Sequence, residues 1–215
     1  MKNLFHIGYH KTATTWFQKK FYPLLKNYNQ VDRSKIRDFF YENNYQDFSS
    51  KKNQIFCDEE LSGNIHNGAY LGLLSENIAT KISKFENPKV IIFIRNQYDI
   101  IVSSYLQYIK EGGNYSFSRY IEHKEFERSN RSSLFSFKHF DYKNLIHKYQ
   151  SLIGKENVYI YLFEDFITDQ ELFISSFIKD HNLEIDLNKV DFKKNNNSYS
   201  YVSLFFARII NSFSR

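Results

Sequence analysis

Four short apolar runs stand out along the chain. They are rich in β-branched and aromatic residues, are bounded by Gly, Pro, Asn or charged residues, and cover residues 3–8, 54–57, 89–95 and 158–163. Apolar runs of this length without polar alternation are typical of strands that are buried on both faces of a sheet. We therefore expect each run to form a buried strand.

Between these runs, apolar residues recur at three- and four-residue spacing. This period predicts helices over residues 14–25, 99–110, 142–153 and 170–181. Alternating strands and helices indicate the α/β class, with a central parallel sheet flanked by helices. Ligands of such sheets bind beyond the carboxyl ends of the strands, where the helices begin. Residues 201–213 form a last amphipathic pattern, which predicts a terminal helix.

Composition and charge limit the kinds of ligand, partner and metal site that the chain can have. The chain has 215 residues, which suits a single domain over residues 1–215, and its 22 Phe and 17 Tyr predict a core built from rings. The net charge of +5 suits a pocket for a multiply charged anion, and no block of like charges marks a nucleic-acid partner. The lone Cys57 excludes an internal disulfide and a cysteine-based zinc cluster, and we expect no metal. No secretory signal or membrane-spanning run is apparent, so we expect a cytoplasmic protein.

The first motif with chemical content is "GYHKTATT", residues 8–15, where a strand runs into a helix. Amides at a helix start point outward and bind phosphate or sulfate. Lys11 adds a mobile cation, and the threonine hydroxyls add donors without charge. The alternative is a threonine-rich helix start with an incidental lysine.

This loop differs from the nucleotide-triphosphate loop G-x-x-x-x-G-K-[ST]. That loop has a second glycine directly before its lysine, a position that His10 takes here. No apolar strand ends in a clear magnesium-binding aspartate either. The loop therefore predicts a site for one or two phosphate-like groups.

A second motif of the same kind is "VIIFIRNQYDIIVSSY", residues 90–105. Arg95 ends the strand and can bind an oxyanion through two hydrogen bonds, while Ser103 adds a hydroxyl from the helix. The alternative is an Arg95 paired with Asp99, which would cap the helix. Two anchors on two strands predict a ligand with two separated anionic groups.

At this point the sequence resembles the sulfotransferases that use 3′-phosphoadenosine 5′-phosphosulfate (PAPS). "GYHKTATTW" resembles their 5′-phosphosulfate loop, and "RNQYDIIVSSY" resembles their 3′-phosphate segment. "NVYIYLFEDF" resembles a largely structural family signature, in which we interpret Glu164 and Asp165 as helix-capping residues. The resemblance spans residues 4–200 and implies the P-loop-like sulfotransferase fold. Three departures are His10 and Gln97 in place of prolines and Ala13 in place of a glycine, which is awkward if that position needs a positive φ.

The resemblance also implies roles for individual residues. Lys11 would neutralise the leaving oxygen during catalysis, Trp16 would stack on adenine or be a core aromatic, and Arg95 with Ser103 would hold the 3′-phosphate. The predicted loop that holds the 5′-phosphate consists of His10, Lys11, Thr12, Ala13, Thr14 and Thr15. The late polar segment would contact the nucleotide through Lys194, Asn197 and Ser198.

The acceptor hydroxyl needs a general base. The segment "IFCDEELSG", residues 55–63, places carboxylates directly after a buried strand and resembles a glutamate-bearing stretch of bacterial and carbohydrate sulfotransferases. We rank Glu59 first and Glu60 second, and interpret Asp58 as a turn or cap residue. His10 and His66 are rival bases, and His6 inside the first strand is interpreted as structural.

The sequence therefore predicts metal-independent, in-line transfer of a sulfuryl group from PAPS to a hydroxyl of a carbohydrate or glycolipid acceptor. Residues 112–140 would form an insert on the acceptor side. The alternatives are a P-loop kinase or other NTPase, and a non-catalytic nucleotide-binding protein. The terminal amphipathic helix, residues 201–213, would allow peripheral membrane contact.

Overall fold

The sheet consists of five parallel strands. The computed structural model describes residues 2–42, 48, 52–122, 135–192 and 201–213. The strands lie in the order β2-β3-β1-β4-β5. Their bounds are Asn3–Gly8 (β1), Tyr28–Gln30 (β2), Asn53–Cys57 (β3), Pro88–Ile94 (β4) and Val158–Leu162 (β5). The predicted α/β class is confirmed, and the short β2 is the strand that the apolar pattern did not indicate.

The four helices expected from periodicity are present. The first is irregular, because α1 (Thr14–Trp16) continues as a π-helix (Phe17–Phe21) and a 3₁₀ turn (Tyr22–Leu24). The others are α4 (Gln97–Lys110), α7 (Tyr142–Ile153) and α9 (Gln170–His181). Further helices are α2 (Arg33–Phe40), α3 (Leu73–Ile82), α5 (Phe117–Glu122), α8 (Phe163–Thr168) and α10 (Tyr201–Phe213), with 3₁₀ turns η3 (Glu59–Ser62), η4 (Ile65–Tyr70), η5 (Phe137–Phe140), η6 (Lys155–Asn157) and η7 (Leu187–Lys189).

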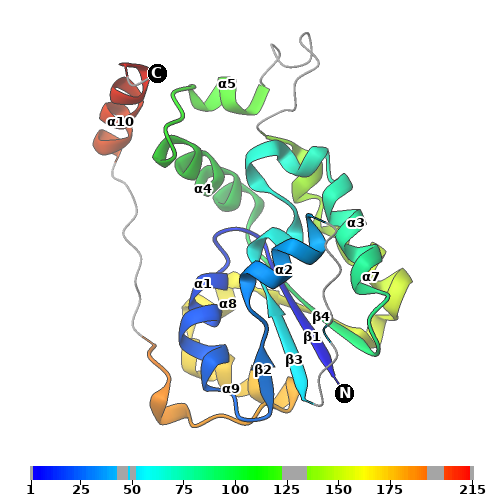
Figure 1. The fold of residues 1–215 in the computed structure, drawn as a ribbon. Helices are drawn as coiled ribbons and strands as arrows, with labels where there is room; N and C mark the ends of the chain where they lie inside the picture. The colour runs from blue at the N-terminus through cyan, green and yellow to red at the C-terminus, as the bar shows by residue number, and fades with distance from the viewer. Residues whose placement is uncertain (1, 43–47, 49–51, 123–134, 193–200, 214–215) are drawn as a thin grey trace.

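Helices cover both faces of the sheet (Figure 1). Because side chains alternate along a strand, Phe5 faces one layer and its neighbour Leu4 faces the other. The layer under Phe5 is formed by α2, α3, α4 and α7, and the layer under Leu4 by α1, α8 and α9. The sheet is thus buried on both sides, as its continuous apolar runs predict.

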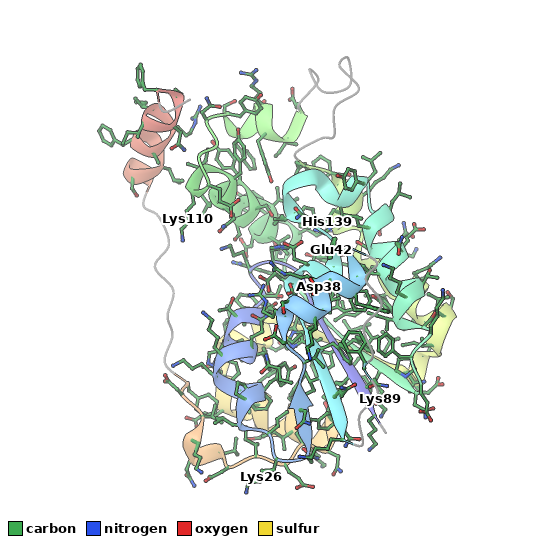
Figure 2. All side chains as sticks on the ribbon, viewed as in Figure 1. Lys26, Asp38, Glu42, Lys89, Lys110 and His139 are labelled. Carbon is green, nitrogen blue, oxygen red and sulfur yellow. The ribbon has the colours of Figure 1, made fainter. Side chains whose placement is uncertain are left out.

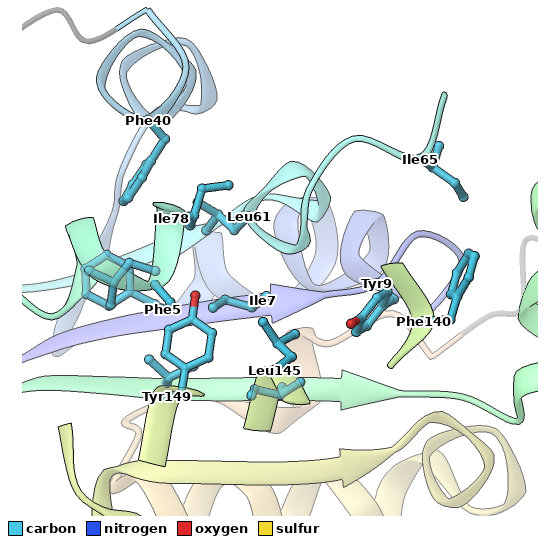
Figure 3. Close-up of a cluster of buried hydrophobic side chains, with 14 of the residues drawn as sticks. Phe5, Ile7, Tyr9, Phe40, Leu61, Ile65, Ile78, Phe140, Leu145 and Tyr149 are labelled. Atoms are coloured by element: carbon cyan, nitrogen blue, oxygen red, sulfur yellow. The ribbon is translucent and has the colours of Figure 1, made fainter. Parts of the chain in front are cut away.

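The core is built from rings, as the composition predicts. Phe5 stacks on Phe56 with 4.5 Å between ring centroids, and Tyr149 is wholly buried in the same cluster. Figure 3 shows this cluster continuing past the end of β1 to Tyr9 and Phe140. The aromatic core therefore supports the segment that follows β1.

The described parts of residues 112–140 contribute to this core. Tyr120 on α5 is buried and packs against Phe135, and Phe135 packs against Phe140. Residues 123–134 lie outside the described residues. The assignment of this segment to the acceptor side remains a prediction.

The terminal helix α10 packs against α4. The Asn211 amide donates hydrogen bonds of 2.8 Å to the carbonyls of Ile109 and Gly113. Other apolar side chains of α10 are exposed, Phe213 among them. None of the helices in the described part of the chain is long and apolar enough to span a bilayer, and peripheral contact through α10 remains a prediction.

Three buried histidines should make stability depend on pH. Burial lowers the pKa of His6 to about 3 and the pKa values of His139 and His181 to about 4. The unfolded chain, with histidine pKa values near 6.5, therefore takes up protons first as the pH falls, and the folded state loses stability from pH 6.5 downward. For His139 alone the loss reaches about 3 kcal/mol by pH 4.

Urea unfolding at pH 7 and pH 4.5 measures this loss. Neither ring nitrogen of His139 has a hydrogen-bond partner in the described structure, so His139→Phe removes the ionisation without breaking a hydrogen bond. We expect the fall in unfolding free energy between the two pH values to shrink by about 2–3 kcal/mol in this variant. The control is His147→Gln, a change on the exposed side of α7. An equal fall in wild type and His139→Phe would contradict the prediction.

Candidate functional site

The site lies where three neighbouring strands end. β1 is the central strand of the sheet, and β3 and β4 pair with it on either side. Their registers pair His6 with Cys57 and Gly8 with Phe93, so the carboxyl ends of the three strands reach the same edge. The segments that follow these ends carry the anion loop, the carboxylates and Arg95. The sheet thus brings together three segments that are far apart in sequence.

The anion loop is closed by Thr12. This buried residue donates both its amide (3.2 Å) and its hydroxyl (2.5 Å) to the carbonyl of Tyr9. A Cβ atom on Gly8 would lie 2.8 Å from the Thr12 hydroxyl and closer still to that of Thr14, so only glycine fits there. The hydroxyl predicted as a ligand at Thr12 is therefore used inside the loop.

The Thr14 hydroxyl, unlike that of Thr12, is not used within the loop. Its side chain is buried at the start of α1, and its hydroxyl has no hydrogen-bond partner in the described structure. An unsatisfied buried hydroxyl is unfavourable unless a ligand completes it. The first amides of α1, at Thr14 and Thr15, also have no partner inside the helix. These donors suit a bound anion.

The loop backbone is left-handed at two residues that are not glycine. Lys11 has a φ of 68° and Ala13 a φ of 67°. Ala13 therefore has the positive φ that is unfavourable for a residue with a side chain, the case that the sequence raised for this position. Such strain costs about 1–2 kcal/mol per residue and gathers at functional sites.

The Lys11 side chain extends from the loop to α4. Its Nζ donates to Oε1 of Gln107 at 2.7 Å, and Gln107 in turn donates to Glu111. Burial and the nearby Lys110 lower the pKa of Lys11, and the charges of Glu111 and Glu59 oppose this shift. Sequence reasoning missed Gln107, although its place on the same helix face as Ser103, one turn on, is a signal that could have revealed it.

Arg95 lies against the same loop. Its Nη1 donates to the Ser103 hydroxyl at 3.2 Å and to the Lys11 carbonyl at 3.4 Å, and its guanidinium lies 4.9 Å from the Phe163 ring centroid. Among the described residues, Arg95 forms no ion pair with Asp99. The two predicted anchors are thus in direct contact.

The turn after Arg95 is fixed by other residues than those we expected. Asn96 caps α4 by accepting from the amides of Tyr98 and Asp99, so Asp99 is not the cap. Glu164 accepts a 2.8 Å hydrogen bond from the Asn96 amide and therefore holds the neighbouring turn. The capping role expected of Glu164 and Asp165 is wrong for α8, whose start has no side-chain cap; Phe163 and Glu164 instead contact Arg95 and the residue after it.

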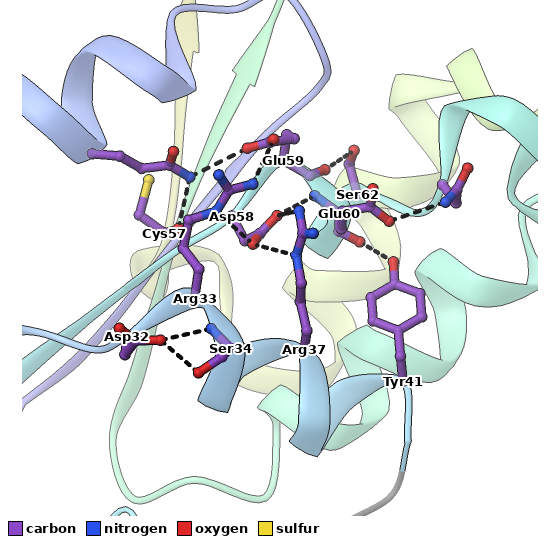
Figure 4. Close-up of polar contacts among 12 residues, drawn as sticks. Asp32, Arg33, Ser34, Arg37, Tyr41, Cys57, Asp58, Glu59, Glu60 and Ser62 are labelled. Carbon is purple, nitrogen blue, oxygen red and sulfur yellow. Dashed lines mark hydrogen bonds and ion pairs between the residues drawn. The ribbon is translucent and has the colours of Figure 1, made fainter. Parts of the chain in front are cut away.

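Two of the carboxylates after β3, those of Asp58 and Glu59, accept hydrogen bonds from α2 (Figure 4). Asp58 is wholly buried, caps η3 through the Glu60 amide, and accepts from Arg33 at 3.0 Å and from Arg37 at 3.1 Å. Burial alone would raise the pKa of Asp58, but the hydrogen bonds from the two guanidiniums outweigh it and lower the pKa. The cap role expected for Asp58 is confirmed, and the two arginines were missed.

Glu59 and Glu60 have different partners. Glu59 accepts from Arg33 at 2.7 Å and from Gln18 at 3.2 Å, and its charge acts on Lys11. Glu60 accepts from Asn64 at 3.2 Å and lies 4.0 Å from Nε2 of His10. Both carboxylates therefore lie at the loop edge, as expected.

Trp16 packs in the second core layer. Its indole donates to the Asp191 carbonyl at 3.0 Å and stacks on Phe21 and Phe192. These contacts fit the core-aromatic interpretation, and adenine stacking remains a prediction. Lys194, Asn197 and Ser198 lie outside the described residues, as does the His66 side chain.

His6 has the structural role expected of it. Its Nδ1 lies 2.6 Å from the Tyr22 hydroxyl, and its ring stacks on Phe93 inside the core. Its lowered pKa keeps it neutral beneath the loop.

Comparison with known proteins identifies the architecture. No protein-family model and no curated protein sequence matches the chain. A crystal structure of a sulfotransferase from Alicyclobacillus acidocaldarius superposes with a TM-score of 0.64 and 15% identity over 98% of this chain and 94% of that one. Mouse sulfotransferase SULT7A1, complexed with PAP, aligns over 100% of this chain and 66% of its own, with 12% identity and a TM-score of 0.49. On the strength of the first superposition, the chain has the sulfotransferase fold.

Proposed function

We propose that this protein is a sulfotransferase that moves a sulfuryl group from PAPS to an acceptor hydroxyl. The observation that carries the proposal is the contact of Arg95 with both Ser103 and the Lys11 carbonyl, which joins two anion anchors into one site. The unpartnered Thr14 hydroxyl and the strained loop support it. A bisphosphorylated nucleotide has the two separated anionic groups that such a site needs.

Each anchor would hold one end of the nucleotide. The amides and hydroxyls of Thr14 and Thr15 would bind the 5′-phosphate, as helix starts do. Arg95 and Ser103 would bind the 3′-phosphate, because a guanidinium forms two parallel hydrogen bonds to an oxyanion. Thr12 would keep the loop closed.

Transfer itself needs positioning and charge stabilisation more than covalent chemistry from the protein. PAPS would supply the sulfuryl group: its bond to the bridging phosphate oxygen breaks as a bond to the acceptor oxygen forms. The Lys11 ammonium would neutralise the negative charge on the bridging oxygen, and Glu59 would take the proton of the acceptor hydroxyl. Glu60 is the second choice for this base.

We propose a carbohydrate or glycolipid as the acceptor. A glutamate base supports this class, and so do exposed rings such as Tyr98 and Phe137, which can stack on sugar faces. Sulfation of a panel of amino sugars, uronic acids, glycolipids and phenols tests the class. Turnover of phenols alone would contradict it.

Calorimetric titration with 3′-phosphoadenosine 5′-phosphate, in the absence of metal, tests the nucleotide site. Removing Arg95 should weaken binding about 10- to 100-fold, because hydrogen bonds to charged groups are worth about 1.5–3 kcal/mol. The control is Lys89→Ala, which removes one positive charge at the opposite end of the same strand; Figure 2 shows Lys89 far from Lys110 on α4. We expect this control to bind like wild type.

The same titration separates the alternatives. ATP and AMP, each with and without magnesium, are titrated beside the bisphosphate. No binding of the bisphosphate, or a preference for magnesium–ATP, would overturn the proposed function and favour a kinase. Binding of the bisphosphate without transfer to any acceptor would favour a non-catalytic nucleotide-binding protein.

A further inference from the structure

The carboxylate segment after β3 is bound from two sides. Arg33 on α2 donates to Glu59 at 2.7 Å, and Gln18 in the helix that follows the anion loop donates to the other oxygen of Glu59 at 3.2 Å. Gln18 also donates to the Cys57 carbonyl at 3.0 Å, which fixes its amide in place. Each oxygen of Glu59 therefore has a defined protein donor.

The orientation of the Arg33 guanidinium is fixed by a second contact, separate from the one with Glu59. Its Nε donates to the wholly buried Asp58 at 3.0 Å, and its Nη2 is the atom that reaches Glu59. Because the guanidinium is planar and rigid, fixing Nε on Asp58 also fixes the direction of Nη2. Asp32 starts α2 by capping the Ser34 amide at 2.8 Å, which sets the helix that carries Arg33.

Arg37 lies one turn further along α2 and provides a natural comparison. It donates to Asp58 through Nε at 3.1 Å, nearly the same contact as that of Arg33. In the described contacts it donates no hydrogen bond to Glu59. The two arginines thus share the Nε contact with Asp58, but Nη2 of Arg33 donates to Glu59, whereas Nη2 of Arg37 donates to the second Asp58 oxygen at 3.4 Å (Figure 4).

From this arrangement we infer that Arg33 is a positioning residue that orients the Glu59 carboxylate toward the acceptor hydroxyl. The inference rests on the proposed function, in which Glu59 is the general base. A carboxylate on a free side chain samples several rotamers, and holding it in one removes that cost from the reaction. Arg33 would act on the transfer step through Glu59, and the hydrogen bonds described for its side chain go to Asp58 and Glu59.

A double-mutant cycle between Arg33 and Glu59 tests the inference. Arg33→Gln should lower kcat about 10- to 100-fold, the scale of a misplaced catalytic group, and leave the affinity for 3′-phosphoadenosine 5′-phosphate unchanged. In a Glu59→Gln background the same change should have almost no further effect on kcat, because the group that Arg33 orients is already lost. Arg33→Lys, which keeps the charge but not the fork, should recover part of the activity.

Arg37→Gln is the matched control. It removes the same kind of bond to Asp58, so both single variants should lose similar thermal stability, while Arg37→Gln should keep kcat within about threefold of wild type. Equal losses of kcat in the two variants, or additive effects of Arg33→Gln and Glu59→Gln, would overturn the inference and leave the proposed function standing. A wild-type protein that binds no bisphosphate or sulfates no acceptor would overturn the proposed function, and this inference with it.

Discussion

Replacing Lys11 by alanine is expected to lower kcat for sulfuryl transfer by about 100- to 1,000-fold, the usual cost of removing one group that stabilises transition-state charge. The Lys11 ammonium lies at the carboxyl edge of the sheet, within reach of Gln107 on α4 and under the influence of the Glu59 charge. In the proposed complex, the ground-state nucleotide would keep its other contacts with the loop and Arg95. The affinity for 3′-phosphoadenosine 5′-phosphate should therefore fall much less than kcat.

Steady-state kinetics with PAPS, together with calorimetry, separate these two effects. The control is Lys20→Ala, because Lys20 lies in the π-helix that follows the anion loop and its ammonium pairs with Asp191 at 2.8 Å. We expect Lys20→Ala to change kcat by no more than a few-fold. A Lys11→Ala variant with normal kcat and poor binding would show that Lys11 only binds the ground state.

Replacing Glu59 by glutamine should lower kcat about 100- to 10,000-fold, the contribution of a positioned general base. Glutamine keeps the volume and a carbonyl oxygen for Arg33, so the contact between Arg33 and Asp58 is preserved, although the hydrogen bond from Gln18 is lost. What is lost is the ability to accept the acceptor proton. Binding of the spent nucleotide should be unaffected.

Measuring kcat of Glu60→Gln in the same way shows which of the two neighbouring carboxylates, Glu59 or Glu60, is the general base. Glu60 contacts Asn64 and lies 4.0 Å from His10, so it is bound to a different part of the site. We expect only a few-fold loss of kcat for Glu60→Gln. A large loss there with a small one at Glu59 would reverse the assignment of the base.

Much of the fold follows from patterns that are local in sequence. β1, β3, β4 and β5 are apolar runs, and α4, α7 and α9 show helical periodicity over twelve or more residues. β2, at Tyr28–Gln30, is only three residues long and has one buried residue, so it has no pattern of its own. Its position is set by pairing with β3.

The site was predictable where its chemistry is carried by a motif. The anion loop and Arg95 follow strands, so the parallel sheet places them together. Arg33 and Arg37 could not be inferred in this way, because their role comes from packing α2 against Asp58, more than twenty residues away. The left-handed φ of Ala13 could be raised only as a possibility, because the sequence alone does not fix the conformation of the loop.

The hydrogen bond from Arg95 to the Lys11 carbonyl would link the two proposed anion anchors thermodynamically. A ligand that redirects Arg95 changes a restraint on the loop, and a ligand that reshapes the loop changes a partner of Arg95. Linkage is reciprocal: if occupation of one anchor raises the affinity of the other by some factor, occupation of the second raises the affinity of the first by the same factor. On the proposed function, selection of a nucleotide with two phosphates over one with a single phosphate would therefore arise from cooperation between the anchors as well as from the number of contacts.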